Sequence, residues 1–366
     1  MPSPRPDDPA PFESLFGGGP ADRAMERVPP VPPGDSVRSI AARLPAHVRL
    51  GTSSWAYPGW RGIVYGSRAP AAALAADGLA AYAEWPLHRT VGLDRAFYAT
   101  PSAAEYRALA ALVPEGFRFV VKAEQRATRP DMAPDGSTLG STLGSTTALR
   151  ASGIANPLFL DASFLRDAVV APAVEGLGAK LGPVVLQFPY IDLSARARVG
   201  GPGAFVDRLA SCLERLRGLE CAGAPVTFAV EVRNRELFRD AAVRGYAAAL
   251  AAGGAVHGYL QHPTVPPIPE QRAALAAAGL DAAAGRAVVV RWMLPAGMTY
   301  EAAADRFEPF DRLQAPDESV RAEVAEILAA SAAARPGFVV INNKAEGSAV
   351  RSVEALAAAI AERPPG

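Results

Sequence analysis

At 366 residues and 50% hydrophobic composition, the chain is long enough for one large domain or two ordinary ones with a substantial core. Lysine plus arginine and aspartate plus glutamate are balanced at 37 each, so the formal net charge is zero. This balance disfavours nucleic acid and anionic membranes as partners, because both attract proteins with an overall positive charge. The two cysteines, Cys212 and Cys221, and the four histidines lack the spacing of metal ligands, so we predict no metal site built from them. A carboxylate-bound magnesium ion stays open as an alternative, and no cofactor is predicted.

The first 46 residues are rich in proline, glycine and charge, as in the run VPPVPPGD. Such a composition buries too little apolar surface to order itself, so residues 1–46 are predicted to form a disordered tail. Residues 47–366 are predicted to form a single domain. No basic segment followed by an apolar stretch marks a secretory signal, and no long apolar run marks a membrane span. We therefore expect a cytoplasmic protein.

From residue 48 onwards, short apolar or β-branched runs alternate with alanine-rich segments of helical character. Parallel strands need helical crossovers between them, so this alternation is typical of βαβ units. Eight such units predict a (β/α)8 TIM-barrel-like fold of the α/β class. A doubly wound open sheet is the alternative, but no GxGxxG motif follows the first strand. The predicted strands are 48–53, 89–94, 117–122, 183–188, 226–231, 255–260, 287–292 and 338–342, and the predicted helices are 70–84, 102–112, 161–178, 203–217, 235–252, 269–283, 316–334 and 348–362.

A tandem repeat, GSTLGSTLGSTT at 136–147, interrupts the connection between the third and fourth predicted strands. Glycine, serine and threonine at this density indicate a flexible surface loop. We favour a length-variable insertion without a role over an active-site lid.

Polar side chains gather near the C-terminal ends of the predicted strands. In the segment 226–233, Phe228, Val230 and Val232 share the side that suits the helix layer, so Glu231 and Arg233 are predicted to point into the barrel. Catalytic groups in such barrels come from the C-terminal ends of several strands, so the inward residues predict one shared site. The same alternation turns these further residues inward: Asp94, Lys122, Gln187, Tyr259, Gln261 and Arg291.

The candidate catalytic residues are Glu231, Lys122 and Asp94. Glu231 is the best general acid or base, because burial raises the pKa of a carboxyl group while neighbouring arginine lowers it. The polar segment 342–346 after the last strand is expected to join the same barrel mouth and to bring Glu346 with it. For each charge, an ion pair that merely plugs the barrel is the alternative. The candidate substrate-binding residues are Arg233, Arg291, Asn342, Asn343, Lys344, Gln187, Tyr98 and Trp55.

Six short motifs follow one another along the chain. They are GTSSWAYPGWR from Gly51, the pair Phe97-Tyr98, FRFVVK from Phe117, LQFP from Leu186, AVEVR from Ala229 and NNKAEG from Asn342. Together and in this order they resemble the family of unknown function 72 (DUF72), also called YecE-like. The resemblance covers about residues 48–362. It implies a TIM-barrel-like fold and no particular reaction.

Two departures mark this chain as a divergent member of the group that it resembles. Where that family usually reads Val-Glu-Ile-Asn, this chain has Gly92 in place of the glutamate and Asp94 in place of the asparagine. Where that family usually reads Arg-x-His-Gly after the seventh strand, Met293 stands in place of the histidine. Family chemistry that needs the glutamate or the histidine is not expected to carry over.

The mouth residues favour an enzyme acting on a small anionic or sugar-like metabolite, since arginine and lysine neutralise phosphate or carboxylate groups. A hydrolase, a lyase and an isomerase all remain open, as does the oligomeric state. A non-catalytic small-molecule-binding protein is the alternative from another class. A phosphodiester- or nucleic-acid-processing enzyme ranks below both, because the chain lacks a basic stripe.

Overall fold

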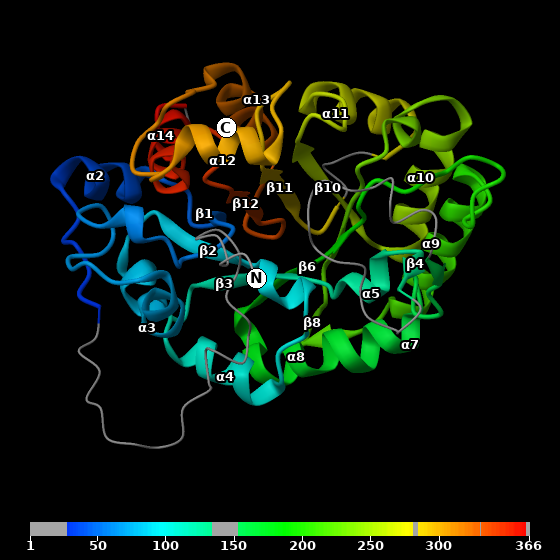
Figure 1. Cartoon of the computed structure of the whole chain (residues 1–366), viewed down its shortest axis with the longest axis horizontal. Coiled ribbons are helices and arrows are strands. Elements are labelled where there is room, and N and C mark those ends of the chain that lie inside the picture. Colours follow the sequence, from blue (N-terminus) through cyan, green and yellow to red (C-terminus); the bar gives the residue numbers. More distant parts are fainter. Residues whose placement is uncertain (1–27, 134–152, 281–284, 330, 364–366) are drawn as a thin grey trace.

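The computed structural model describes residues 28–133, 153–280, 285–329 and 331–363. Within them, eight parallel strands close into a barrel in the order β1-β12-β11-β10-β9-β6-β3-β2, and helices encircle them (Figure 1). Both the predicted α/β class and the predicted (β/α)8 barrel are confirmed. The barrel strands are β1 (Val48–Thr52), β2 (His88–Leu93), β3 (Arg118–Lys122), β6 (Leu181–Gln187), β9 (Phe228–Glu231), β10 (Val256–Gln261), β11 (Val288–Trp292) and β12 (Gly337–Ile341).

Each predicted helical segment contains a helix, although several are shorter than predicted. Apolar faces of these helices cover the outside of the barrel, as in α9 (Pro202–Leu216), where Phe205, Leu209 and Leu213 are all buried. A short π-helical turn, η3 (Leu165–Val170), joins α7 (Ala162–Phe164) to α8 (Ala171–Leu177) within the predicted segment 161–178. The longer helices after the strands are α3 (Ala71–Glu84), α4 (Ala103–Ala111), α8 (Ala171–Leu177), α9 (Pro202–Leu216), α10 (Asp240–Gly253), α11 (Ile268–Ala277), α13 (Glu318–Ala329) and α14 (Ala349–Ala361).

The barrel interior is filled by a separate cluster of small and branched residues. Val120, Val185, Ala229 and Val289 belong to it, so the face of each strand that was predicted to point inward does so in β3, β6, β9 and β11. In the parallel ladder Gln187 lies opposite Glu231, two positions beyond this layer. The polar residues therefore sit above an apolar plug, at the C-terminal end of the barrel.

The inward face was predicted wrongly in β10. Val256 belongs to the interior cluster, so the alternation turns Tyr259 outward with His257. The two rings pack edge to face at 4.8 Å, and the His257 ring also bonds to Tyr246 of α10. Tyr259 thus packs in the helix layer. In β10 the even-numbered residues face the interior, whereas the prediction had placed the odd-numbered residues there.

Residues 28–46 are ordered in the structure, contrary to the predicted tail, whose residues 1–27 lie outside the described part. Helix α2 (Asp35–Arg43) buries Val37 and Ile40 and contacts α14, beside which it lies in Figure 1. The guanidinium of Arg89 donates to the carbonyls of Ala41 and Pro45 at 3.1 and 2.8 Å. The prediction rested on the proline-rich composition of this segment and overlooked its short apolar stripe, Val37 and Ile40. A helix this short is stabilised mainly by packing against the rest of the domain.

The tandem repeat at 136–147 lies outside the described residues. On either side of it, β4 (Asp131–Met132) and β5 (Ile154–Ala155) form a two-stranded antiparallel pair. A second element that the sequence did not indicate is α12 (Tyr300–Phe307), which the Thr299 side chain caps. No helix in the described part of the chain is long and apolar enough to cross a membrane.

Candidate active site

Arg291, on the interior face of β11, is held by two carboxylates at the barrel mouth. Its Nη1 donates to Glu231 Oε2 at 2.8 Å, and its Nη2 donates to Asp94 Oδ1 and Oδ2 at 2.9 and 2.8 Å. Burial alone would lower the pKa of Arg291, but Asp94 and Glu231 outweigh it and raise that pKa. Arg291 is therefore a fixed cation whose hydrogen-bonding capacity is largely consumed by the protein.

Glu231 is fully buried at the end of β9, and only one of its oxygens is satisfied. Burial alone would raise the pKa of Glu231, but Arg291, Arg233 and Lys122 outweigh it and lower that pKa. The group is a carboxylate at neutral pH. Its Oε1 has no hydrogen-bond partner among the described residues and lies 3.9 Å from Arg233 Nε, beyond hydrogen-bonding distance.

Arg233, just beyond β9, is the least committed arginine of the mouth. Its Nε is buried without a hydrogen-bond partner in the described part of the chain, while its side chain is 20% exposed. Burial lowers the pKa of Arg233, Glu231 opposes this shift and Arg291 adds to it. The side chain of Asp94 is also partly exposed, at 29%, whereas that of Arg291 is only 2% exposed. These charged side chains therefore reach solvent on the side of Asp94 and Arg233.

Lys122 completes the cluster at the end of β3. Its Nζ lies 3.8 Å from the centroid of the Phe97 ring. Burial lowers the pKa of Lys122 to about 7, with Asp94 and Glu231 opposing and Arg291 adding to the shift. An amine with this pKa exchanges its proton near neutral pH. We call Asp94, Lys122, Glu231, Arg233 and Arg291 the mouth cluster.

The other predicted substrate-binding residues before β12 occupy different surroundings. Gln187 is buried beside Glu231 in the strand register and shares its inward face. Tyr98 is 42% exposed and packs edge to face on Phe97. Trp55 is buried, and its indole N–H donates to the Ala75 carbonyl of α3 at 3.3 Å. The structure thus places Gln187 and Tyr98 near the mouth cluster and Trp55 in the packed core.

The polar segment after β12 mainly organises its own loop. Asn342 Nδ2 donates to Ser53 Oγ at 3.0 Å, and Asn342 Oδ1 accepts from the Lys344 backbone N–H. Asn343 Oδ1 accepts from the Ala349 backbone N–H at 2.8 Å and so satisfies the first residue of α14. Lys344 is fully buried, with its Nζ 4.0 Å from the centroid of the Tyr300 ring. These contacts leave Asn343 and Lys344 outside the mouth cluster.

Glu346 does not belong to the mouth cluster either. Its Oε1 accepts from Arg321 Nη2 at 2.6 Å and from the Asp317 backbone N–H at 2.7 Å. Both partners lie at the start of α13, and Arg321 is only 12% exposed. The expectation that Glu346 lines the mouth was wrong, because this carboxylate instead fastens α13 to the loop.

The two departures from the family pattern have distinct surroundings. A Cβ added to Gly92 would lie 3.1 Å from Val340 Cγ1 and 3.7 Å from Asp94 Oδ1, so this position faces the interior beside Asp94. Met293 packs against the apolar cluster of Leu294 and Phe307 under α12. An apolar contact therefore takes the place where the resemblance implied an imidazole.

Two cationic or titratable neighbours were missed by sequence reasoning. Arg129 lies in the connection after β3. Burial lowers the pKa of Arg129, and the nearby positive charge of Arg233 lowers it further. Burial and Arg233 lower the pKa of His262, the residue after β10, to about 4. The Thr264 backbone N–H donates to His262 Nδ1 at 3.2 Å, so the neutral ring carries its proton on Nε2. Both residues come after the end of a strand, which places them on the C-terminal side of the barrel. The alternation of side chains that applies within a strand does not predict where a loop side chain points.

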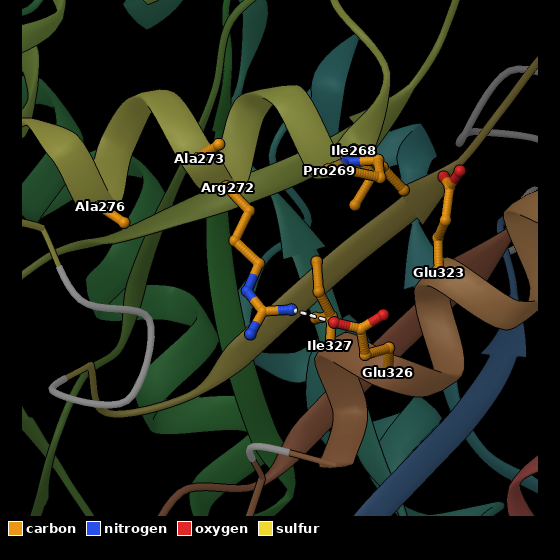
Figure 2. Close-up of a pocket in the computed structure, with 8 residues that line it drawn as sticks. All are labelled: Ile268, Pro269, Arg272, Ala273, Ala276, Glu323, Glu326 and Ile327. Carbon is orange, nitrogen blue, oxygen red and sulfur yellow. Dashed lines mark hydrogen bonds and ion pairs between the residues drawn. The ribbon is translucent and has the colours of Figure 1, made fainter.

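A separate groove lies in the helix layer between α11 and α13, with a volume of about 300 Å³. Figure 2 shows Arg272 reaching across it to Glu326, and the two atoms joined by the dashed line are 2.8 Å apart. Ile268 and Ile327 form its apolar part. No residue of the mouth cluster lines this groove. Within the described ranges, no three His, Cys, Asp or Glu side chains gather as a metal site.

Comparison with known proteins identifies the family. The family described as "Protein of unknown function DUF72" matches residues 49–365. Two crystal structures of a DUF72 family protein from Enterococcus faecalis are similar, with TM-scores of 0.54 and 0.53 and identities of 17% and 16%. Each covers 87% of this chain, and the matches span 96% and 98% of those chains. These identities show a shared fold alone.

A DUF72 family protein from Thermotoga maritima is 18% identical, with a TM-score of 0.49, over 84% of this chain and 97% of its own. No curated protein matches the chain. Because the family match covers nearly the whole barrel, from residue 49 to residue 365, the chain belongs to the DUF72 family.

Proposed function

We propose that the mouth cluster is the active site of an enzyme that acts on a small anionic or sugar-like metabolite. One observation carries the proposal: Glu231 Oε1 and Arg233 Nε are buried, 3.9 Å apart, and neither has a hydrogen-bond partner among the described residues. Buried polar atoms normally have partners, so such a pair is available to a third group. A ligand oxygen and a ligand hydroxyl together would satisfy both atoms.

The charges of the mouth cluster favour an anionic ligand. The positively charged side chains Arg233 and Arg291 face the carboxylates Asp94 and Glu231, and Lys122 adds a further charge whenever it is protonated. Arg291 is already engaged by both carboxylates. Arg233 is the side chain with an unpaired donor and solvent exposure, and arginine binds phosphate and carboxylate groups with matching geometry. We therefore assign the anion to Arg233 rather than to Arg291.

The cluster also contains the groups needed for proton transfer. Glu231 is ionised at neutral pH, so it acts as a general base. Lys122, whose pKa is about 7, exchanges a proton in the same pH range. Both groups lie on the interior face of the barrel, on strands β3 and β9, which β6 separates. This pairing is suited to a hydrolase, a lyase or an isomerase.

A non-catalytic binding protein is the second candidate, and one observation favours it. Gly92 supplies no side chain beside Asp94, and Met293 packs into an apolar cluster where the family usually has histidine. The substitution Glu231→Gln separates the two candidates. An enzyme loses turnover by roughly 100-fold or more while it still binds its ligand, because an amide accepts no proton. A binding protein has no turnover to lose. Nucleic-acid processing ranks last because the net charge is zero.

The anion site is tested by thermal unfolding in increasing phosphate and sulfate. A ligand that binds only the folded state stabilises it by about 2.7 kcal/mol at 100 times its dissociation constant. We expect a concentration-dependent rise in Tm for the wild type that Arg233→Ala removes. The matched control is Arg107→Ala, because Arg107 is 59% exposed and pairs with Glu175 on the helix surface. Equal stabilisation of both variants would contradict the assignment.

A further inference from the structure

The chain uses lysine very sparingly. Of its 37 basic residues only three are lysines, at 122, 180 and 344, and the rest are arginines. Lys180 Nζ donates to the Ala110 and Val113 carbonyls at 2.8 and 2.7 Å, where it closes the end of α4. Lys344 is fully buried under α12. Lys122 is the lysine that lies at the mouth, among arginines that serve as fixed charges.

An amine differs from a guanidinium in one chemical respect that matters here. Lysine can lose its proton and expose a nucleophilic lone pair, whereas arginine stays protonated in proteins. A chain that otherwise prefers arginine thus has a nitrogen nucleophile at its barrel mouth. An ordinary positive charge at this position would not require lysine.

The surroundings of Lys122 leave its nitrogen unengaged. In the described part of the chain its Nζ makes no hydrogen bond or ion pair and rests 3.8 Å from the centroid of the Phe97 ring. The charged groups that face it are Asp94, Glu231, Arg233 and Arg291. The side chain is partly exposed at the end of β3. The nitrogen is therefore close to a general base and to the arginine assigned to the anion.

We propose that Lys122 forms an imine with the carbonyl carbon of an anionic aldehyde or ketone. The inference rests on the proposed function and specifies its substrate class. Arg233 holds the anionic group of this substrate, and Glu231 acts as the general base. A carbonyl compound of this kind fits a lyase or an isomerase better than a hydrolase.

The step is balanced without an oxidant, a reductant or a cofactor. The lone pair of Lys122 Nζ attacks the carbonyl carbon, and the carbonyl oxygen takes up a proton from solvent to give a carbinolamine. Glu231 accepts the proton that leaves the nitrogen and returns it to the departing hydroxyl group. Water leaves, and the C=N bond forms. The protonated imine then withdraws electrons from the neighbouring carbon, which activates bonds there for cleavage or proton removal.

The electrostatic environment supports this reactivity at neutral pH. With a pKa of about 7, half of the Lys122 side chains are neutral at pH 7. An ordinary lysine, with a pKa of about 10.4, is neutral in only about one molecule in a few thousand. A less basic amine is also a weaker nucleophile, and this offsets part of the gain from the larger neutral fraction. A net gain of roughly 30-fold in the rate of imine formation remains.

Reductive trapping tests the inference on the full chain. Wild-type protein is treated with pyridoxal 5′-phosphate, an aldehyde with a phosphate group, together with sodium cyanoborohydride, which reduces the imine to a stable secondary amine. Peptide mapping by mass spectrometry then gives the labelling rate at each of the three lysines, with N-acetyl-lysine in the same solution as the reference amine. We expect Lys122 to be labelled roughly 30-fold faster than the reference amine at pH 7. Labelling no faster than the reference would overturn the inference.

Two further arms separate this inference from the proposed anion site. Pyridoxal, which lacks the phosphate, should label Lys122 more slowly than the phosphate ester, and Arg233→Ala should remove that difference. If phosphate raises Tm through Arg233 while Lys122 stays unlabelled, the imine inference fails and the anion site stands. If Lys122 reacts equally with both aldehydes and phosphate leaves Tm unchanged, the anion site fails, and the inferred substrate class fails with it. Lys122→Met removes the label, and wild-type mapping alone decides the result if that variant does not fold.

Discussion

The substitution Glu231→Gln probes how Arg291 is neutralised. In the wild type Arg291 has two carboxylate partners, Glu231 at 2.8 Å and Asp94 through both of its oxygens. At 2.8 Å and an effective dielectric constant of about 20, the attraction between one such pair of charges is about 6 kcal/mol. The glutamine amide oxygen still accepts a hydrogen bond from Arg291. It also removes the cost of burying a carboxylate, which is several kcal/mol.

These terms largely offset one another, because Asp94 keeps its contacts with Arg291. We expect Glu231→Gln to lower the free energy of unfolding by about 1–2 kcal/mol, whereas a buried ion pair that loses its sole partner costs about 3–5 kcal/mol. For a chain of this size the corresponding fall in Tm is about 1–3 °C. The double variant Asp94→Asn, Glu231→Gln leaves Arg291 without a counter-charge, so its loss should exceed the sum of the single losses by about 1–3 kcal/mol.

Urea unfolding of the wild type, both single variants and the double variant measures this coupling. Glu231→Gln should also strengthen stabilisation by phosphate, because it removes a negative charge beside Arg233. A loss of about 3–5 kcal/mol in Glu231→Gln alone, with no further loss in the double variant, would refute the reasoning. Glu231 would then be the sole neutralising partner and a structural plug.

Three further predictions concern pH, the N-terminal helix and the loop after β12. Burial lowers the pKa of Lys122 to about 7, so between about pH 7 and 10 the unfolded chain binds a proton that the folded chain does not. Wild-type stability should therefore rise with pH in this window relative to Lys122→Met, and parallel urea-derived profiles would count against the shift. Ile40→Ala should lower the free energy of unfolding by about 2–4 kcal/mol, because Ile40 is buried in α2. The exposed control Ser39→Ala should stay within about 0.5 kcal/mol of the wild type. Equal losses in the two variants would mean that α2 does not stabilise the domain. Arg321→Ala should cost about 3–5 kcal/mol because it strands the buried carboxylate of Glu346, and a thermal scan with phosphate should show unchanged anion stabilisation.

The barrel and its inward charges were predictable because they follow a simple periodicity. Strands covered on both faces read as apolar runs, and alternation places Lys122 and Arg291 on the same side as the interior valines. The rule failed at Tyr259, because parity fixes alternation within a strand and not its starting face. Val256 faces the interior, so every residue of β10 lies on the opposite face from the one that was predicted.

The rest depended on contacts that a linear pattern does not contain. Asn343 and Lys344 carry the same amide and amine groups that a binding site would use, yet one satisfies α14 and the other packs on Tyr300. Helix α2 is short and marginal alone, and its apolar residues matter only against α14. The proximity of Arg129 to Arg233 arises from the path of a loop, for which no periodicity exists.

A crystal structure of the wild-type protein grown in phosphate tests the central claim most directly. The account predicts an ion at the barrel mouth within hydrogen-bonding distance of Arg233 Nε, with Arg291 still bound to Asp94 and Glu231. A direct hydrogen bond between Arg233 Nε and Glu231 Oε1, with no ion at the mouth, would contradict it.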